Sequence, residues 1–192
     1  MKLSRYKCLS EAGYSLVEMM MTLAIGLILV SVALPTMIGA IQGYRLNSVS
    51  QQVANLAELT RYTAIRRNSV VSLKQVVQNS NTILFVDLDG DGKLGATEPM
   101  VMLPSDMQFA NGQCPKPDPK TPGLASTVDF AGQITFDYRG TVNFPPGAQL
   151  VTYFLALGYT NQAQYGCRAI TVTPMGQTKV WKAPDNAAWI GM

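Results

Sequence analysis

The stretch that decides the fold lies near the N-terminus, where residues 13–44 read GYSLVEMMMTLAIGLILVSVALPTMIGAIQGY. No charged residue occurs between Met19 and Tyr44. An apolar run of this length can cross a bilayer as a helix. The residues before it are basic, with Lys2, Arg5 and Lys7. Because basic flanks stay in the cytoplasm, we expect the C-terminal part of the chain to be exported.

Two residues interrupt this apolar run. Glu18 lies near its start, and an ionised carboxylate in a membrane-spanning helix costs about 2.5–3.5 kcal/mol on insertion scales, so it needs a partner. Pro35 lies inside the same helical pattern, where it removes a backbone hydrogen bond and costs about 3 kcal/mol in an ordinary helix. Both residues therefore call for a role beyond membrane insertion.

The sequence GYSLVEMM, which begins at Gly13, resembles the prepilin peptidase site of type IV pilins and type II secretion pseudopilins. The resemblance implies cleavage after Gly13 and methylation of the new amine at Tyr14, where the family usually has phenylalanine. It also implies that Glu18 and Pro35 serve filament assembly. The expected division is a leader at 1–13, a transmembrane and filament-core helix at 14–43, and a soluble domain at 44–192.

Charge pairing gives Glu18 a physical role in such a filament. Cleavage before Tyr14 creates a cationic amine in apolar surroundings, and the Glu18 carboxylate of a neighbouring subunit can neutralise it. A buried ion pair is tolerated only when both charges are matched. The expected partners are therefore other pilin or pseudopilin subunits, together with the prepilin peptidase/N-methyltransferase and the inner membrane.

Two simpler interpretations of the segment remain open. Ser15 and Glu18 have the spacing of a capping box, so Glu18 could cap its own helix. The segment could also be an ordinary secretory signal, because Ser31-Val32-Ala33 fits the small-residue rule for cleavage and would leave Leu34 as the first mature residue. The identity of the mature N-terminal residue separates these alternatives.

The periodic pattern predicts that the helix continues into the soluble domain, from Ser15 to about Asn68. Apolar residues recur every three or four positions, as expected for the buried face of an amphipathic helix, at Leu46, Val49, Val53, Leu56, Leu59, Tyr62 and Ile65. Strand-like segments follow: Val70–Val77, Thr82–Leu88, Met100–Leu103, Gln133–Tyr138, Gln149–Ala156, Arg168–Thr173 and Thr178–Lys182. A long helix on an antiparallel sheet is an α+β fold.

The resemblance extends into this domain. The stretches TRYTAIRRNSVVSL, FVDLDGDGKLGATEP, FDYRGTV and CRAITVTPMGQTKV resemble those of pseudopilin H and of FimT-like minor pilins. The resemblance implies a structural minor subunit of a type II secretion pseudopilus or a type IV pilus. It would be a single-pass protein of the bacterial inner membrane, with its C-terminal domain in the periplasm before assembly.

An acidic loop after the second predicted strand fits the spacing of an EF-hand calcium loop, in which alternating oxygen ligands converge on the ion. Its carboxylates are Asp87, Asp89, Asp91 and Glu98, and Lys93 would contribute its backbone carbonyl. The alternative is an acidic hairpin loop held by Asx turns. The sequence leaves both interpretations open.

The three cysteines divide between the leader and the domain. Cys8 lies in the basic leader, whereas Cys114 and Cys167 lie in the part expected to be exported. A pair in an oxidising compartment favours a disulfide over two buried free thiols. Cys114 lies in the proline-rich stretch Asn111–Gly123, which is predicted to be a surface loop.

Nucleic acid binding is the alternative function that the resemblance implies. Some FimT-like pilins bind DNA in natural transformation through a C-terminal GRxR motif, and Gly176-Gln177-Thr178-Lys179 is the matching stretch. Lys179, Lys182 and Trp181 are the candidate contacts, which Arg66, Arg67 and Arg168 could join; the simpler interpretation is a solvated strand end.

The composition bears on both nucleic acid binding and catalysis. The net charge of +3 falls to a near balance of 12 basic and 11 acidic residues without the leader, which gives no global reason for polyanion binding. The chain has no histidine, which excludes histidine-dependent catalytic sites. We therefore expect no enzyme.

Overall fold

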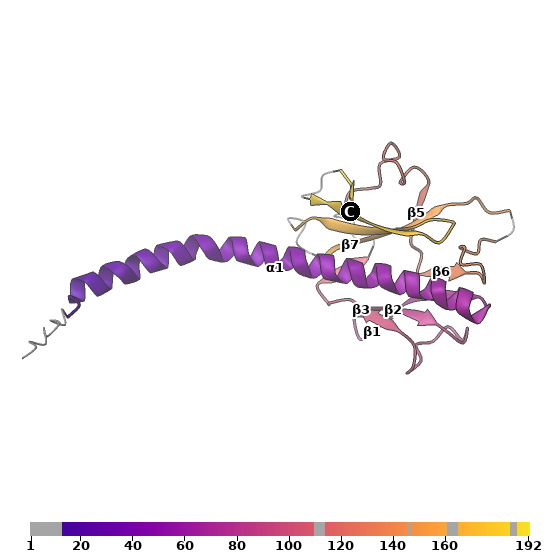
Figure 1. Ribbon diagram of the computed structural model, residues 1–192, viewed down its shortest axis with the longest axis horizontal. Helices are drawn as coiled ribbons and strands as arrows, with labels where there is room; N and C mark the ends of the chain where they lie inside the picture. Colours follow the sequence, from indigo (N-terminus) through magenta and orange to yellow (C-terminus); the bar gives the residue numbers. More distant parts are fainter. Residues whose placement is uncertain (1–12, 110–113, 146, 161–164, 185–187) are drawn as a thin grey trace, which may run out of the picture. The chain divides into compact units, whose positions relative to one another are not determined.

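The computed structural model describes residues 13–109, 114–145, 147–160, 165–184 and 188–192. The expected leader, with Cys8, lies outside the described residues except for Gly13. The chain divides into two compact units, Met1–Ala40 and Ile41–Met192. Figure 1 shows both units, which are described separately below.

A single helix, α1 (Leu16–Arg67), begins in the first unit and ends in the second. Its first turn is closed by the Met19 amide, which donates to the Ser15 carbonyl at 3.2 Å. The helix ends because Asn68 adopts a φ of 48°, a left-handed conformation that commonly terminates helices. The Ser69 amide then donates back to the Ala64 carbonyl at 3.2 Å. The predicted helix is confirmed to within a residue at each end.

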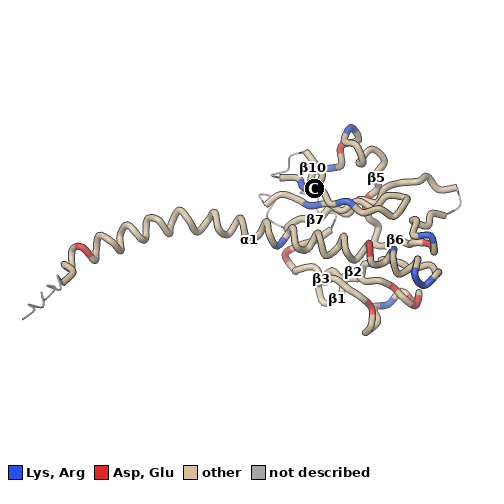
Figure 2. The backbone as a smooth tube through the Cα atoms, viewed as in Figure 1, with Lys and Arg blue, Asp and Glu red and all other residues tan. Residues whose placement is uncertain are grey.

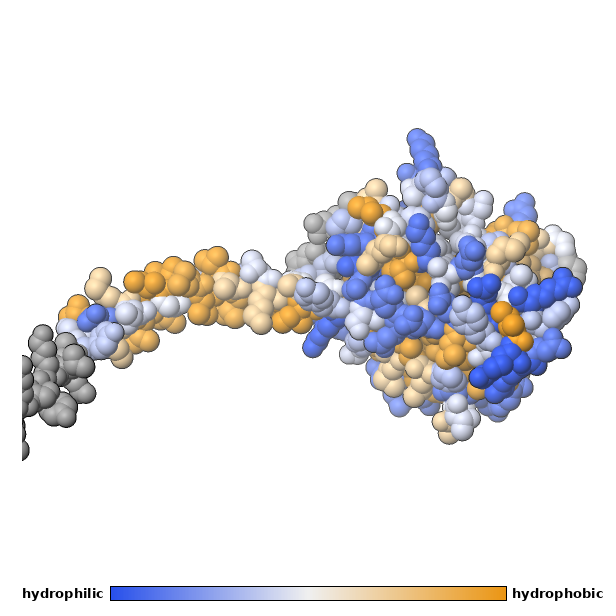
Figure 3. Space-filling model, in the orientation of Figure 1, coloured by the Kyte–Doolittle hydropathy of each residue, from blue (hydrophilic) through white to orange (hydrophobic). Residues whose placement is uncertain are grey.

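In the first unit, the apolar side chains of the helix are exposed, and Figure 3 shows them along the face in view. The hydroxyl groups of Thr22, Ser31 and Thr36 donate to carbonyls three residues earlier. Polar groups satisfied inside the helix suit an apolar environment. Among the described residues, α1 is the one helix long and apolar enough to cross a membrane, although a signal sequence would have the same composition.

The second unit holds two sheets, which flank the C-terminal half of α1 (Figure 1). The first has the order β3-β2-β1-β6, and the second has the order β10-β9-β8-β7-β4, with β5 paired to β7. Their bounds are β1 (Val71–Gln78), β2 (Asn81–Asp87), β3 (Met100–Met102), β4 (Met107–Phe109), β5 (Thr127–Asp129), β6 (Gln133–Phe136), β7 (Thr152–Tyr159), β8 (Cys167–Val172), β9 (Thr178–Ala183) and β10 (Ile190–Gly191).

The predicted α+β fold, a long helix packed on antiparallel sheet, is confirmed, although the strands form two sheets rather than the one expected. All seven predicted strands are present, but β7 begins at Thr152 rather than Gln149. The short strands β4, β5 and β10 were not predicted. The pairing of β5 with β7 is parallel, whereas every other pairing of described strands is antiparallel.

The main core lies between α1 and the two sheets. Leu46, Val49, Val53 and Leu56 are buried there, as the helical pattern predicts. The last three residues of the predicted stripe are wrong as core positions, because the exposed fractions are 42% for Leu59, 59% for Tyr62 and 41% for Ile65. Near its end, the helix instead buries the smaller residues Thr60, Thr63 and Ala64. Small side chains there allow the sheets to approach the helix closely.

Tyr159 anchors the start of the second unit's helical segment. Its hydroxyl lies within hydrogen-bonding reach of both the main-chain and side-chain carbonyls of Gln42. Burial, together with the nearby charge of Asp106, raises the pKa of Tyr159 to about 12, so the hydroxyl keeps its proton. The aromatic ring also packs edge-on against Tyr165. The contact fixes α1 at the first turn of the second unit.

Candidate functional site

The predicted processing site lies at the start of the described chain. Gly13 has no neighbouring atom within 4 Å of where a side chain would begin, and Tyr14 is largely exposed. Glu18 is the one charged residue from Gly13 to Tyr44 and is exposed. Pro35 lies within α1 without ending it. The segment is therefore open to solvent or to partners on all sides.

The capping-box alternative for Glu18 is not supported by the geometry. Ser15 does act as the residue before the helix, because its carbonyl accepts the first helical hydrogen bond. Among the described residues, however, no side-chain hydrogen bond joins Ser15 and Glu18, and Glu18 has no ion pair. Its carboxylate lies in the first turn of α1, where a negative charge favours the helix dipole.

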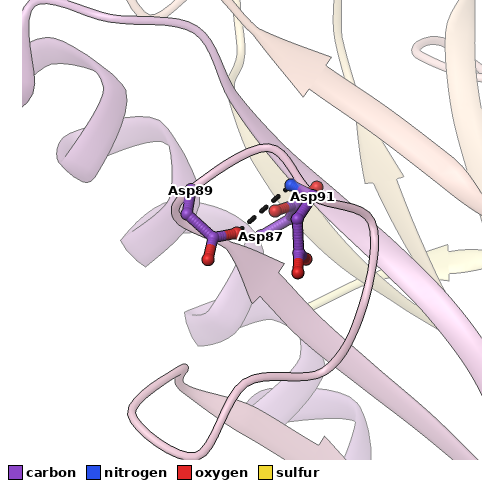
Figure 4. Close-up of side chains that lie close together, drawn as sticks. All are labelled: Asp87, Asp89 and Asp91. Carbon is purple, nitrogen blue, oxygen red and sulfur yellow. Dashed lines mark hydrogen bonds between the residues drawn. The ribbon is translucent and has the colours of Figure 1, made fainter.

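The acidic loop follows β2 and brings three aspartates together (Figure 4). Carboxylate oxygens of Asp87, Asp89 and Asp91 all lie within 4.8 Å of one another. Asx turns fold the loop: the Asp91 amide donates to Asp89 at 3.2 Å, and the Lys93 amide donates to Asp91 at 2.7 Å. The turn-based interpretation of the loop is therefore correct as a description of its hydrogen bonds.

Glu98 holds the far end of the loop and stands apart from this group. Its two carboxylate oxygens accept the amides of Leu88 at 2.7 Å and of Gly95 at 2.8 Å. The residue is nearly buried. The Glu98 carboxylate therefore joins the start of the loop, at Leu88, to its later part, at Gly95.

Lys74 on β1 is the residue that sequence reasoning missed. Its ammonium lies 2.6 Å from Asp87 Oδ2, and the Asp87 side chain is only 1% exposed. The Gly90 and Gly92 amides also donate to Asp87, at 2.8 Å and 3.2 Å. Burial alone would raise the pKa of Asp87, but Lys74 and these amides outweigh it and hold the pKa below 3.8. The sequence offered one sign of this contact, because Lys74 is the single charged residue of β1.

The donor set fits calcium in part. Calcium takes oxygen ligands at about 2.3–2.6 Å, so one ion could bridge oxygens 4.8 Å apart. Lys74, however, already supplies a positive charge to Asp87, and Glu98 is engaged with backbone amides. Calcium binding at Asp87, Asp89, Asp91, Lys93 and Glu98 therefore remains a prediction, and it requires displacement of the Lys74 ammonium.

The calcium hypothesis predicts a specific response to loss of Lys74. Millimolar calcium should raise the melting temperature of the chain, since a ligand that binds only the native state stabilises it. Lys74→Met should enlarge the increase, because the competing ammonium is gone. Thermal unfolding with calcium or with chelator measures both effects. Unchanged melting of both proteins, with no heat of binding in calorimetry, would remove the calcium site.

The disulfide joins Cys114 to Cys167 across 53 residues of sequence. It borders a second, smaller core formed by residues including Phe154, Trp181 and Trp189. The Trp189 indole donates to the Pro115 carbonyl at 3.1 Å, so the proline-rich segment closes over this core. Cys114 and Cys167 therefore form a disulfide in the structure rather than two free thiols.

Removal of this bond should destabilise the domain by about 2–4 kcal/mol, the typical contribution of a native disulfide. The double variant Cys114→Ala/Cys167→Ala should therefore melt at a lower temperature than the oxidised protein. Thermal unfolding with and without reductant provides the measurement. Reductant should leave the double variant unchanged, and equal melting of the oxidised and reduced wild-type protein would contradict the prediction.

The residues proposed for DNA contact do not form one exposed patch. Trp181 is only 3% exposed, and its indole donates to Thr171 Oγ1 at 2.9 Å. Lys179 lies over the Trp181 ring at 4.4 Å. Because side chains alternate along a strand, Lys182 lies on the opposite face of β9 from Lys179. The three residues therefore cannot converge on a single ligand.

The arginines suggested to join that patch are also separate from it. Arg168 is buried, and this burial lowers its pKa. One of its Nη atoms donates to the neighbouring Cys167 carbonyl at 3.1 Å. Arg66 and Arg67 lie at the end of α1, where Arg67 donates to the Leu88 carbonyl at 3.1 Å. DNA binding at Lys179 and Lys182 stays a prediction that this geometry weakens.

Comparison with known proteins identifies the N-terminal segment. The family described as the prokaryotic N-terminal methylation motif matches residues 8–34. No curated protein matches the chain. Two crystal structures of the type IV minor pilin FimU from Pseudomonas aeruginosa are similar to it, with 15% and 16% identity. They cover 76% and 74% of this chain and 92% and 96% of FimU, with TM-scores of 0.49 and 0.48.

At these scores, the likeness to FimU is too weak to support a functional conclusion. The match to residues 8–34 is independent of it and contains Gly13, Tyr14 and Glu18. It also covers the exposed apolar helix as far as Leu34. The chain therefore carries the prokaryotic N-terminal methylation motif, which is the signal segment of type IV pilins.

Proposed function

We propose that the chain is a structural minor subunit of a pilus-type filament. Prepilin peptidase cleaves it after Gly13, and the new amine of Tyr14 is methylated. The apolar half of α1 anchors the protein in the bacterial inner membrane, with the second unit in the periplasm. The same helix then enters the filament core. The absence of histidine from the sequence also favours a structural over an enzymatic role.

One observation supports this proposal above the others. Glu18 is the sole charge in an exposed apolar helix segment, and it lies inside the matched methylation motif. Among the described residues, it has no ion-pair or hydrogen-bond partner. A carboxylate among apolar neighbours needs a cation, and the processed amine of a second subunit has the required charge.

The mature N-terminus tests the processing step directly. We expect N-terminal sequencing and intact mass to give N-methylated Tyr14 in cells that contain prepilin peptidase. Deletion of the peptidase should leave the longer chain, still in the membrane. A mature protein that begins at Leu34 would instead identify an ordinary secretory signal and contradict the proposal.

The proposed filament is either a type II secretion pseudopilus or a type IV pilus. Both use the same kind of processed helix, so residues 14–43 favour neither. The two filaments differ in location, because a type IV pilus extends outside the cell, whereas a pseudopilus stays in the periplasm. Detection of the chain by immunoblot in sheared extracellular filaments supports the pilus. Retention with the cell envelope, together with loss of protein secretion on deletion, supports the pseudopilus.

A further inference from the structure

A cavity of about 340 Å³ lies beside α1, just after the uncharged run of the helix ends. We call it the Arg45 pocket; it is lined by Arg45, Ser48, Val49, Pro104, Asp106 and Met107. All six residues belong to the second unit. The volume lies at the lower end of the range for small-molecule sites. Figure 2 shows the long uncharged stretch of α1 that precedes the second unit.

The two walls of the Arg45 pocket are fixed to the same end of β7. On one side, α1 is held by the contact of Gln42 with the hydroxyl of Tyr159, the last residue of that strand. On the other side, the Asp106 carbonyl accepts the amide and the hydroxyl of Thr160, at 2.9 Å and 3.2 Å. Two consecutive residues therefore hold both walls, so the pocket is built into the fold.

Opposite charges lie on the two walls. Arg45 on α1 and Asp106 in the turn before β4 are both exposed. Within the described part of the chain, no ion pair or side-chain hydrogen bond involves either of them. In addition to the effect of burial, Asp106 raises the pKa of Tyr159 and Arg45 lowers it. Both charges thus lie near the same hydroxyl, yet too far apart to pair with each other.

The position of the pocket along α1 matches the lipid headgroup layer. Tyr44 ends the uncharged run and is 77% exposed, and tyrosine is enriched at membrane–water interfaces. From Arg45 to Val49 the helix rises about 6 Å, and the headgroup layer on each side of a bilayer is roughly 5–7 Å thick. Because residues 14–43 are proposed to span the membrane, the pocket lies at headgroup height in the anchored protein.

The charges of the lining select among lipid headgroups. A guanidinium binds phosphate through paired hydrogen bonds, and the exposed Ser48 hydroxyl shares a helix face with Arg45. Asp106 repels a headgroup of net negative charge but attracts an ammonium. Proteins recognise the quaternary ammonium of choline with aromatic cages, whereas none of the described lining residues is aromatic. A primary ammonium, which donates hydrogen bonds to a carboxylate, fits this lining better.

We propose that the Arg45 pocket holds the phosphoethanolamine headgroup of a membrane phospholipid. Arg45 contacts the phosphate and Asp106 contacts the primary ammonium. The buried side chains of Val49 and Met107 form the apolar floor below them. The headgroup supplies the counter-charges that both residues lack within the described part of the chain. This inference rests on the proposed membrane anchor, and it adds a lipid contact made by the second unit before filament assembly.

The test uses the full chain in micelles that contain equal amounts of phosphatidylethanolamine, phosphatidylcholine and phosphatidylglycerol, with native mass spectrometry to identify the retained lipid. The wild type should retain phosphatidylethanolamine in preference to the other two. Asp106→Asn should lower this retention by about threefold to fivefold, as expected for one exposed ion pair, and should raise retention of phosphatidylglycerol. Arg45→Gln should lower retention of phosphatidylethanolamine by a similar factor, without favouring phosphatidylglycerol.

The matched controls are Arg66→Gln and Asp129→Asn, which remove the same charges from exposed positions at the far end of α1 and in β5. Both controls should retain lipid as the wild type does. Equal losses in the controls and in the pocket variants would show a general charge effect and overturn the proposal. A wild type without a headgroup preference would overturn it too. Circular dichroism confirms that each variant is folded.

Flotation with lipid vesicles separates failure of the pocket from failure of the membrane anchor. A chain that floats but shows no headgroup preference rejects the pocket alone. A chain that does not float rejects the anchor and the pocket together. If Arg45→Gln and Asp106→Asn reduced incorporation into filaments but left lipid retention unchanged, the pocket would be a contact between subunits, and the lipid proposal would be wrong.

Discussion

Glu18→Ala should abolish incorporation of the chain into filaments, while leaving its insertion into the membrane intact. The carboxylate has no side-chain partner among the described residues, so its removal costs the monomer only the roughly 0.3–1 kcal/mol that a first-turn charge gains from the helix dipole. In the proposed filament, the same substitution leaves the amine of a neighbouring Tyr14 without a counter-charge. Loss of one partner from a buried pair costs about 3–5 kcal/mol. Immunoblots of membrane and filament fractions measure the two effects separately.

Glu18→Asp and Glu18→Gln are the informative controls for that experiment. Aspartate keeps the charge on a shorter side chain and should restore part of the incorporation. Glutamine keeps the shape without the charge and should behave like alanine. If glutamine and glutamate assembled equally well, charge pairing would not be the role of this position. Equal assembly of the alanine variant would reject the filament interpretation of Glu18 altogether.

Asp87→Ala should destabilise the second unit by about 3–5 kcal/mol, as expected when one partner of a buried ion pair is removed. The substitution leaves the Lys74 ammonium and the Gly90 and Gly92 amides without their acceptor. Because this carboxylate joins β1 to the loop after β2, local order there should also be lost. Thermal or denaturant unfolding of the full chain in detergent measures the effect. Asp89→Ala, on the exposed part of the same loop, is the matched control and should have little effect.

The pH dependence of the same pair has a defined sign. The pKa of Asp87 in the folded chain lies below its ordinary value of 3.8, so the folded state binds this proton less readily than the unfolded state. Its contribution to stability is therefore fully present above about pH 4 and is lost as the pH falls through the lower, folded value. Asp87→Ala should lack this part of the acid sensitivity. An identical acid profile in the variant and the wild type would contradict the assignment.

The sequence predicted the elements of the fold better than their arrangement. Alternation located seven of the ten described strands, because side chains at strand positions must match a buried and an exposed face. Which strands pair depends on contacts between residues far apart in sequence. Local patterns therefore did not show that the strands form two sheets rather than one. The helix stripe failed at Leu59, Tyr62 and Ile65 because an apolar residue at the correct spacing is buried only where another element covers it.

The candidate sites differ in how many of their residues could be predicted from the sequence. Spacing alone was enough to predict that the three aspartates of the loop lie together, because they fall within five residues of sequence. Lys74 could not be predicted in this way, since its contact with Asp87 depends on the register of β1 and β2. Lys179 and Lys182 looked like neighbours in sequence, but the alternation of β9 separates them.

The Tyr159 contact with Gln42 has a consequence for soluble fragments of this protein. A fragment that starts at Ile41 would retain the acceptor groups and the whole second unit. A cut after Gly43 would remove both Gln42 groups that the Tyr159 hydroxyl contacts and leave the new helix end to fray toward Leu46. The fragment that starts at Ile41 should therefore resist proteases, whereas the fragment cut after Gly43 should be digested readily.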